Sequence, residues 1–485
     1  MEEKMTFDEA LEYINEIGKK GSVLGLGPVT ELLKRLDDPQ EKIDIIHVAG
    51  TNGKGSICTF LEMMYREEGK VVGRYISPTI NDYLERFQIN GNYMKEADFT
   101  RLFERVYDAI VKMENEGLNL PTAFEIETAI AFLYFEESDI DLVILEVGMG
   151  GREDATNVIK HPICTVFANI GMDHMQYLGD TIEKIAYEKA GIIKNGCPAV
   201  SYPSEAAVIE VLRGEYDRVN QSNSGDRDND GNVSVKYNEG DINGSLNNNF
   251  IVADTNNLDI IEEDLTGSTF IYKGEEYSIS LAGKYQILNA ITAIETKLLL
   301  DGKLKKEALL KVSWDGRFEK ISDEPLFIRD GAHNIQGVTA LKESLSENFT
   351  DARYIFIIGV LKDKEYEKMM ELLCPMAETC YLIRPDNPRG LDTKTLKAVV
   401  DRYCDDVTRC DTVEEAIGKA VEKTVFKTTE EVGGNVFGAG YNNVGGMKNE
   451  DKAFDTKQSV IVAWGSLSYI GKCNRKILND MIRRY

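Results

Sequence analysis

The sequence predicts an α/β protein with more than one domain, in which a mostly parallel sheet carries a phosphate-binding loop. The chain has 485 residues, which exceeds the size of one typical hydrophobic core. Short apolar runs alternate with amphipathic helical patterns, and one run leads into a glycine-rich turn that contains a lysine. Strands that are apolar throughout and joined by helices are typical of parallel sheets covered on both faces.

The glycine-rich turn lies within Ile43–Tyr65, which is spelled IDIIHVAGTNGKGSICTFLEMMY. Its glycines at 50, 53 and 55 lack side chains, so backbone N–H groups can surround an anion. Lys54 supplies a positive charge for the phosphates of a nucleotide, and the helix that we expect to begin near Ser56 adds the positive end of its dipole. A turn that only joined a strand to a helix would need neither the lysine nor the hydroxyl.

Further apolar runs predict parallel strands near Val71–Ile76, Leu142–Val147 and Ile163–Ala168. The run at Leu142–Val147 ends, like the first run, in a glycine-rich segment. Because ligands bind beyond the carboxyl ends of strands in open α/β sheets, both segments point to one site. A buried lone carboxylate would be costly at Glu146 without a cation. This residue is therefore well placed as one of the few protein ligands that Mg²⁺ on a nucleotide needs.

A second α/β series follows a helical pattern at Ile287–Leu300. Its strands are expected near Leu326–Ile328, Tyr354–Ile358, Tyr381–Ile383 and Val460–Ala463. We place the domain boundary between Leu300 and Val312, which gives domains of residues 1–300 and 313–485.

Two segments rich in Asn and Gly interrupt this pattern. In 220–257 we expect hairpins and mobile loops, with short apolar stretches such as Val233–Tyr237. The segment 432–455 follows no expected strand and opens no expected helix, so we interpret it as a surface insertion.

Composition excludes several classes of partner. Lys and Arg number 56 against 82 Asp and Glu, a net charge of −26, which argues against nucleic acid or an anionic membrane as a partner. The N-terminal MEEKMTFDEALEYINEIG has the pattern of an amphipathic helix, and no stretch approaches the roughly 18 apolar residues of a membrane helix. We expect a cytoplasmic protein. The eight cysteines form no C-x-x-C pair and are expected to be buried free thiols.

The turn departs from the standard G-x-x-x-x-G-K-[ST] loop, and its spelling GTNGKGS (50–56) resembles the folylpolyglutamate synthase/dihydrofolate synthase branch of the Mur ligase superfamily. DLVILEVGMGGREDATN (141–157) and NIGMDHMQYLGDTIEKIAYEKAGIIK (169–194) also resemble that branch. Five shorter segments continue the pattern: GKYQILNA (283–290), WDGRFE (314–319), DGAHN (330–334), NPRG (387–390) and GSLSYIG (465–471). The resemblance implies a P-loop-type, mostly parallel sheet domain followed by a smaller C-terminal α/β domain of Mur ligase type.

The resemblance further implies ATP-dependent amide formation. A folate-type carboxylate attacks the γ-phosphate to give an acyl phosphate, and the amine of L-glutamate then displaces phosphate. Such chemistry needs charge neutralisation and alignment more than a protein nucleophile. The implied partners are ATP, L-glutamate and a reduced folate or dihydropteroate, with two Mg²⁺ ions as cofactors. We expect a monomer.

The family's ATP-binding positions fall on both expected domains. They correspond here to Gly53, Lys54, Gly55, Ser56, Asn289, Arg317 and Asp330. By resemblance Asn289 contacts the adenine, whereas Arg317 and Asp330 reach ATP when the domains close. For His333 in DGAHN, a role at the nucleotide and a capping role are equal alternatives.

Ser77, Glu146 and His174 resemble the family's metal ligands, although without the resemblance His174 is equally well explained as a cap of its turn. By composition alone Lys189 would be a surface or salt-bridged lysine. The lysine of this EKAGI segment is commonly carbamylated in the family, and a lysine with a lowered pKa can add carbon dioxide to give a carboxylate that binds a second Mg²⁺. The implied catalytic residues are Lys54, His174 and Lys189.

Two segments resemble the family's folate-binding positions. They contain Thr122, Ala123, Phe124 and Glu125, and Glu153, Asp154 and Ala155. The ring of Phe124 is suited to pack on a pterin, but Phe124 and Phe132 at helical spacing are also typical of a helix core. Where the family has S-P-H, this chain has Ser77-Pro78-Thr79, so the loop 79–91 is expected to hold its substrate differently.

Two other functions are weighed against this one. A Mur-type ligase acting on a cell-wall precursor shares the reaction, but the phosphate loop begins near Gly50 and leaves no evident N-terminal domain for a UDP-sugar. A nucleotide-binding regulator without catalysis is disfavoured by the joint presence of the implied lysine, metal and ATP positions. Synthesis of dihydrofolate, extension of polyglutamate tails, or both fit the sequence equally.

Overall fold

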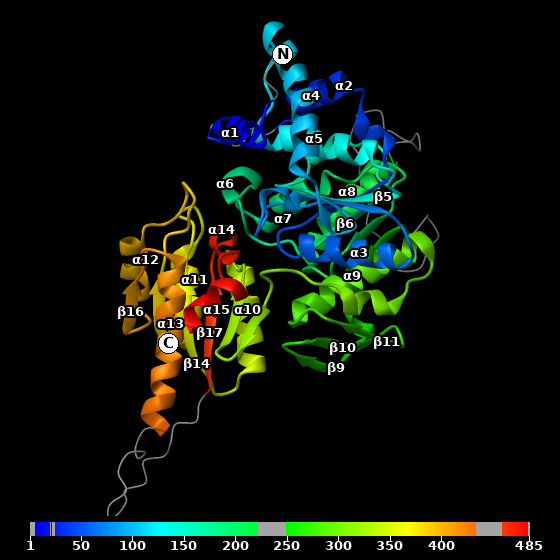
Figure 1. The fold of residues 1–485 in the computed structure, drawn as a ribbon. Coiled ribbons are helices and arrows are strands. Elements are labelled where there is room, and N and C mark those ends of the chain that lie inside the picture. Colours follow the sequence, from blue (N-terminus) through cyan, green and yellow to red (C-terminus); the bar gives the residue numbers. More distant parts are fainter. Residues whose placement is uncertain (1–4, 20, 22–24, 222–248, 433–457, 484–485) are drawn as a thin grey trace, which may run out of the picture. The chain divides into compact units, whose positions relative to one another are not determined.

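A computed structural model describes residues 5–19, 21, 25–221, 249–432 and 458–483. The chain divides into two compact units (Figure 1), which consist of Met1–Ser280 with Lys284–Ser313, and of Leu281–Gly283 with Trp314–Tyr485. The stretch Val233–Tyr237 and most of the second Asn/Gly-rich segment lie outside the described residues.

The first unit contains an 8-stranded sheet in the order β4-β3-β2-β5-β1-β6-β7-β8. Its strands are β1 (Ile45–Ala49), β2 (Val72–Tyr75), β3 (Phe87–Ile89), β4 (Asn92–Tyr93), β5 (Leu142–Glu146), β6 (Cys164–Phe167), β7 (Ala199–Ser201) and β8 (Phe250–Val252). The strands β2, β5, β1, β6, β7 and β8 pair in parallel with their neighbours. The strands β3 and β4 add an antiparallel edge next to β2. The four strands expected from the apolar runs are confirmed, and β1 and β5 are buried along their whole length.

Helices cover both faces of this sheet. They are α1 (Phe7–Gly18), α2 (Gly27–Arg35), α3 (Lys54–Glu67), α4 (Glu96–Asn115), α5 (Ala123–Glu137), α6 (Met175–Leu178), α7 (Ile182–Ala190), α8 (Ala206–Gln221) and α9 (Lys284–Asp301). Helix α3 packs against α9 and the central strands, while one apolar cluster joins α1, α2, α4 and α5 to the opposite face. A second cluster joins α7 and α8 to that face.

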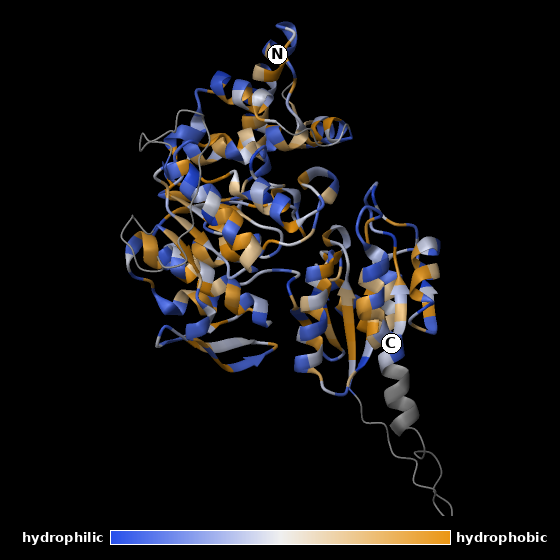
Figure 2. Ribbon diagram, turned by 180° about the vertical axis from the view of Figure 1, so that it is seen from behind, coloured by the Kyte–Doolittle hydropathy of each residue, from blue (hydrophilic) through white to orange (hydrophobic). Residues whose placement is uncertain are grey.

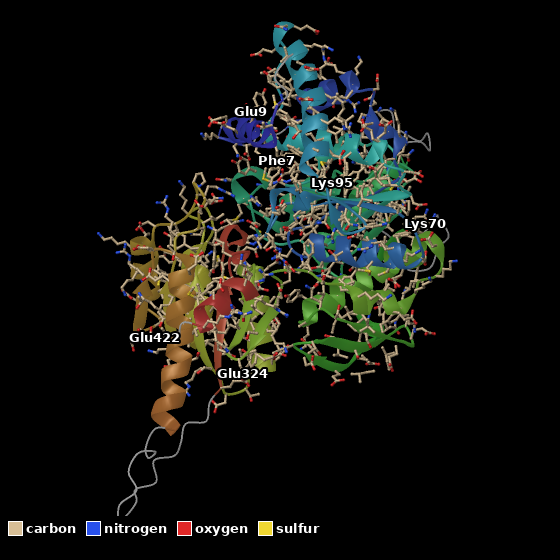
Figure 3. All side chains as sticks on the ribbon, viewed as in Figure 1. Phe7, Glu9, Lys70, Lys95, Glu324 and Glu422 are labelled. Atoms are coloured by element: carbon tan, nitrogen blue, oxygen red, sulfur yellow. The ribbon has the colours of Figure 1, made fainter. Side chains whose placement is uncertain are left out.

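The N-terminal helix has the amphipathic character expected from the sequence. Thr6 and Glu9 form a capping box, in which each side chain bonds the backbone N–H of the other residue, and this arrangement fixes where the helix begins. Phe7, labelled with Glu9 in Figure 3, meets the ring of Phe99 edge-on at 5.4 Å between centroids. The aromatic contact attaches α1 to α4.

One expectation for the Asn-rich segment is wrong. Residues 250–252 were expected in hairpins or loops, but they form β8, which pairs in parallel with β7. A strand of three residues at the edge of a sheet contributes too short an apolar run to be recognised within a polar stretch. Beyond β8, the strands β9 (Leu258–Asp264), β10 (Gly267–Tyr272) and β11 (Glu275–Ile279) form a separate antiparallel sheet.

The second unit is built around a 6-stranded sheet in the order β12-β13-β17-β14-β15-β16. Its strands are β12 (Glu319–Asp323), β13 (Leu326–Asp330), β14 (Arg353–Ile358), β15 (Ala377–Leu382), β16 (Asp406–Arg409) and β17 (Ser459–Trp464). Its helices are α10 (Ile335–Asn348), α11 (Tyr366–Leu373), α12 (Thr393–Val400), α13 (Val413–Val432), α14 (Leu467–Ile470) and α15 (Arg475–Ile482). All strands except β12 pair in parallel, and the central ones are hydrophobic, as Figure 2 shows.

All eight cysteines are buried and form no disulfide bonds, as expected. None of the helices in the described part of the chain combines the length with the apolar character that a bilayer span requires.

Candidate active site

The phosphate-binding loop lies where β1 ends and α3 begins. Gly53 occupies the N-cap of α3 with φ of +90°, a conformation that glycine adopts without the cost that a side chain would impose. The helix begins at Lys54, slightly earlier than the expected start near Ser56. The Lys54 ammonium is 3.6 Å from Glu146 Oε1 and 3.4 Å from the carbonyl oxygen of Thr51. The loop therefore presents a lysine and a helix N-terminus together, as an anion site requires.

The loop is attached to the segment that follows β6. The backbone N–H groups of Thr51 and Asn52 both donate to the carbonyl of Asn169, at 2.8 and 3.1 Å. The Thr51 hydroxyl donates to the carbonyl of Gly171 and accepts from its N–H, at 3.0 and 3.1 Å. Sequence reasoning did not assign Thr51 a role. One signal was available: Thr51 follows β1, whose neighbour in the parallel sheet is β6, so proximity to the segment after β6 was to be expected.

Asn289 contacts the loop from α9. A Cβ placed on Gly53 would come within 2.4 Å of Asn289 Oδ1, so these two residues touch. The Asn289 amide donates to Gln286 at 3.0 Å, and both side chains are buried. The structure thus brings Asn289 to the phosphate loop within the first unit.

The expected metal ligands come from three strand ends. Glu146, at the end of β5, is 5% exposed, and Ser77 follows β2 and is partly buried. His174 has φ of +50° and occupies the N-cap position of α6 without making a side-chain capping bond. Its backbone N–H donates to Asp173. The imidazole therefore does not cap α6.

These residues are compatible with Mg²⁺ bound to a nucleotide. Among the described residues no group of three His, Cys, Asp or Glu side chains gathers to hold an ion. Mg²⁺ keeps several waters and needs only one or two carboxylates together with the phosphates of its nucleotide. The buried Glu146 carboxylate, with Lys54 as its neighbour, fits that requirement.

Lys189 is buried beneath the phosphate loop, so its interpretation as a surface lysine is wrong. Its side chain is 4% exposed, and its ammonium donates to the carbonyl of Gly50 at 2.9 Å. Burial, and secondly the charge of Lys54, lower the pKa of Lys189 from its ordinary 10.5 to about 7. Such a lysine is largely neutral just above neutral pH, which is the state that adds to carbon dioxide.

The turn after β5 fixes the end of α7 where Lys189 lies. The N–H of Arg152 donates to the carbonyl of Glu188 at 2.8 Å. A Cβ on Gly151 would come within 2.8 Å of the carbonyl oxygen of Lys189, so only glycine permits this approach. The Asn157 amide donates to the carbonyl of Gly191 at 3.1 Å.

Phe124 lies against the same turn. Its ring is packed on Gly148, where an added Cβ would be 2.5 Å from the ring tip, and it lies 6.1 Å from the ring of Tyr75. Phe124 is partly buried, whereas Phe132 is fully buried in the core. The two phenylalanines therefore differ in environment, and of the two only Phe124 is partly exposed.

The other expected folate-binding residues lie at the start of α5 and in the turn after β5. Thr122 caps α5 and forms a capping box with Glu125, whose second oxygen accepts from the N–H of Val29 at 3.2 Å. Burial raises the pKa of Glu125. Ala123 is partly buried, Glu153 is exposed, and Asp154 and Ala155 are buried. The carboxylates of Glu125 and Asp154 are thus engaged by protein groups.

In the second unit, Asp330 organises the turn that carries Arg317. Its carboxylate accepts from the N–H of Phe318 and the N–H of Ala332, both at 2.7 Å. Phe318 has φ of +45°, a conformation unfavourable for an aromatic residue, which the bond to Asp330 supports. Arg317 packs over Gly331, and the His333 ring bonds the carbonyl of Gly331 at 2.7 Å.

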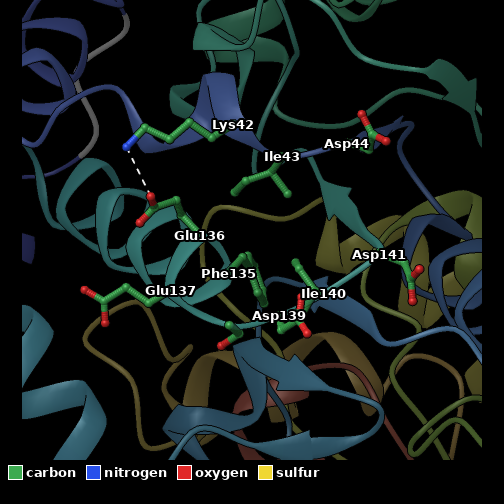
Figure 4. A pocket seen from close by; sticks show the side chains of 10 residues that line it. Lys42, Ile43, Asp44, Phe135, Glu136, Glu137, Asp139, Ile140 and Asp141 are labelled. Atoms are coloured by element: carbon green, nitrogen blue, oxygen red, sulfur yellow. Dashed lines mark hydrogen bonds and ion pairs between the residues drawn. The ribbon is translucent and has the colours of Figure 1, made fainter.

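A cavity of about 530 Å³ in the first unit lies away from these residues. It is lined by Lys42–Asp44 and Phe135–Asp141 (Figure 4), which precede β1 and β5. Three of its carboxylates form ion pairs: Glu136 with Lys42, Glu137 with Arg101, and Asp141 with Lys70. The phosphate loop and Glu146 lie at the opposite, carboxyl ends of the same strands.

Comparison with known families agrees with this geometry. Residues 48–296 match the Mur ligase middle domain, and residues 316–428 match the Mur ligase, glutamate ligase domain. The chain belongs to the Mur ligase family.

Among Mur ligase relatives, the dihydrofolate synthase/folylpolyglutamate synthase of Bacillus subtilis is 35% identical over 80% of this chain and 88% of that protein. The folylpolyglutamate synthase of Lacticaseibacillus casei is 31% identical over 80% of this chain and 87% of that protein. A crystal structure of folylpolyglutamate synthase from Thermotoga maritima superposes with a TM-score of 0.73 at 26% identity, over 97% of this chain and 96% of that chain. These likenesses bear out both the branch and the α/β fold expected from the motifs.

Proposed function

We propose that the protein is an ATP-dependent ligase that attaches L-glutamate to the carboxylate of a folate. The observation that carries this proposal is the phosphate loop with Lys54 beside the buried Glu146, in a chain related over most of its length to folylpolyglutamate and dihydrofolate synthases. A cell-wall precursor as substrate is disfavoured by the same relatives.

The reaction proceeds in two displacements. An oxygen of the folate-type carboxylate attacks the γ-phosphorus of ATP, the bond to the bridging oxygen breaks, and ADP leaves. The amine of L-glutamate then attacks the acyl carbon, phosphate leaves with the carboxylate oxygen, and the amine loses a proton to form the amide. Lys54 and the N-terminal N–H groups of α3 stabilise negative charge on the transferred phosphoryl group.

Two Mg²⁺ ions are proposed as cofactors, and they supply charge neutralisation at the phosphates when bound. Ser77, Glu146 and His174 are proposed to hold one of them. Lys189 is proposed to hold the other after carbamylation, in which the neutral amine adds carbon dioxide and releases one proton. Its low exposure and its lowered pKa of about 7 support this modification.

The remaining residues are assigned to the two substrates. Gly53, Gly55, Ser56 and Asn289 are proposed to bind ATP in the first domain, and Arg317 and Asp330 in the second, with domains of 1–300 and 313–485. Thr122, Ala123, Phe124, Glu125, Glu153, Asp154 and Ala155 are proposed to form the folate site. The partial exposure of Phe124, whose ring packs on Gly148, supports stacking with a pterin.

We also propose that the enzyme acts as a monomer in the cytoplasm. A single species at the mass of one chain in light scattering supports the monomer, and a dimer that persists on dilution contradicts it.

A substrate comparison tests the proposed function. Purified protein with ATP, Mg²⁺ and L-glutamate is offered dihydropteroate, tetrahydrofolate or a UDP-linked cell-wall precursor, and ADP release is followed together with product mass. Turnover with either pteridine substrate supports the proposal and tells the two folate activities apart. Turnover only with the cell-wall precursor, or nucleotide binding without turnover, contradicts it.

A further inference from the structure

His47 is a polar residue in the centre of an apolar strand. It lies in β1, opposite Leu145 of β5 and Thr165 of β6, and its side chain is completely buried. A leucine would fill such a position without needing hydrogen bonds. The presence of a histidine here is explained by its hydrogen-bond partner, the hydroxyl of Thr156, which lies 2.8 Å from Nε2.

His47, Thr156 and Asp154 form a chain of side-chain hydrogen bonds. The direction of these bonds follows from Asp154, its last member. Thr156 Oγ1 is 2.6 Å from Asp154 Oδ1, and each Asp154 oxygen also faces a backbone N–H donor, so both oxygens act as acceptors. The Thr156 hydroxyl therefore donates to Asp154, and its oxygen accepts the Nε2–H of His47. The ring is thus neutral, with an unprotonated Nδ1 that is buried and has no hydrogen-bond partner. A second proton on Nδ1 would find no acceptor, which agrees with the lowering of the His47 pKa to about 3, caused chiefly by burial.

Asp154, at the other end of this hydrogen-bond chain, holds the Gly148–Gly151 turn of the proposed active site. Asp154 Oδ2 accepts the N–H of Met149 at 2.7 Å, and Oδ1 also accepts the N–H of Thr156 at 3.0 Å. Met149 lies between Gly148, which carries the Phe124 ring, and Gly151, which approaches Lys189. The carboxylate of Asp154 is 5% exposed, so water does not compete for these bonds.

We propose that His47, Thr156 and Asp154 are positioning residues that fasten the Gly148–Gly151 turn to β1 and so set the place of Phe124 against the folate substrate. This inference rests on the proposed function and assigns His47 and Thr156 a role in positioning the turn. All three members of this hydrogen-bond chain are polar, although they lie inside a core where apolar residues of the same shape would pack equally well. Its polarity is explained by the backbone N–H of Met149, which only an acceptor held in place can satisfy.

Matched substitutions at Thr156 test the proposal. Thr156→Val keeps the shape and loses the hydroxyl, whereas Thr156→Ser keeps the hydroxyl. Loss of a hydrogen bond to a charged group is expected to raise KM for the pteridine substrate roughly tenfold in Thr156→Val. KM for ATP should stay within about twofold, because the bonds of Thr51 in the phosphate loop are untouched. Thr156→Ser should resemble the wild type. His47→Leu, which removes only the remote donor, should fall between the two variants.

A second measurement needs no substrate. Hydrogen exchange of peptides that contain Met149, followed by mass spectrometry, should be faster in Thr156→Val than in Thr156→Ser, with His47→Leu again intermediate. If Thr156→Val does not fold, His47→Leu and His47→Gln, which restores a donor near Nε2, carry the same comparison. Unchanged exchange at Met149, or a lower melting temperature without any change in KM for the pteridine, overturns the proposal. A wild-type enzyme that is inactive on every folate refutes the proposed function instead, while the exchange result still decides the role of the chain.

Discussion

The buried Lys189 should make the stability of the protein increase with pH above neutrality. In the unfolded chain its pKa returns to its ordinary 10.5, whereas in the folded protein it is about 7. Between these values the unfolded state binds more protons, so the free energy of unfolding rises as pH rises, by up to about 1.4 kcal/mol per pH unit. Over the whole window this amounts to about 5 kcal/mol. Below pH of about 7 both states carry the proton and the dependence disappears.

The comparison of Lys189→Met with the wild type isolates this contribution. Urea unfolding is measured at several values of pH between 7 and 9 in metal-free buffer purged of carbon dioxide, so that no carbamate forms. The wild type should gain stability relative to Lys189→Met as pH rises. Lys184→Met serves as control, because Lys184 lies on the same helix but is exposed and paired with Asp180. Parallel pH profiles for wild type and Lys189→Met would refute the buried, neutral state of this amine.

Three further substitutions test other parts of the site. Lys54→Ala should lower kcat by at least about a hundredfold in a protein that still folds, with a lower melting temperature because the buried Glu146 loses its neighbouring cation. Lys70→Ala removes an exposed lysine paired with Asp141 and should leave kcat unaffected. Near-normal turnover of Lys54→Ala contradicts the role of the loop. Gly148→Ala places a methyl 2.5 Å from the Phe124 ring and should destabilise the protein by about 1–3 kcal/mol while raising KM for the folate, and equal KM values argue against stacking on that ring. Arg317→Ala should raise KM for ATP roughly tenfold without lowering the melting temperature of the protein, and unchanged kinetics for ATP exclude the second domain from the nucleotide site.

The central strands and the phosphate loop were predictable because their signals are local. Continuous apolar runs distinguish strands that are buried on both faces, and the spacing of glycines around Lys54 indicates an anion site without knowledge of the fold. The short edge strand β8 was missed, since its three residues lie in a polar stretch.

The burial of Lys189 was also within reach of the sequence. Four buried residues of α7 lie at 185, 186, 189 and 190, so the lysine shares the face of Ile185 one turn earlier. The sequence pattern of a single helix does not say which partner covers that face. Contact with the carbonyl of Gly50 depends on how α7 crosses the end of β1. For the same reason, the bonds of Thr51 to the segment after β6 could not be predicted from the chain alone.

Isotope transfer tests the central claim most directly. A pteridine substrate labelled with ¹⁸O in the carboxylate that receives glutamate is incubated with the protein, ATP, Mg²⁺ and L-glutamate, and the released phosphate is examined by mass spectrometry. Attack of the carboxylate on the γ-phosphorus predicts that one labelled oxygen appears in phosphate for each amide formed. Phosphate without label, at undiminished rates of glutamate addition, would contradict an acyl phosphate and with it the mechanism proposed for this site.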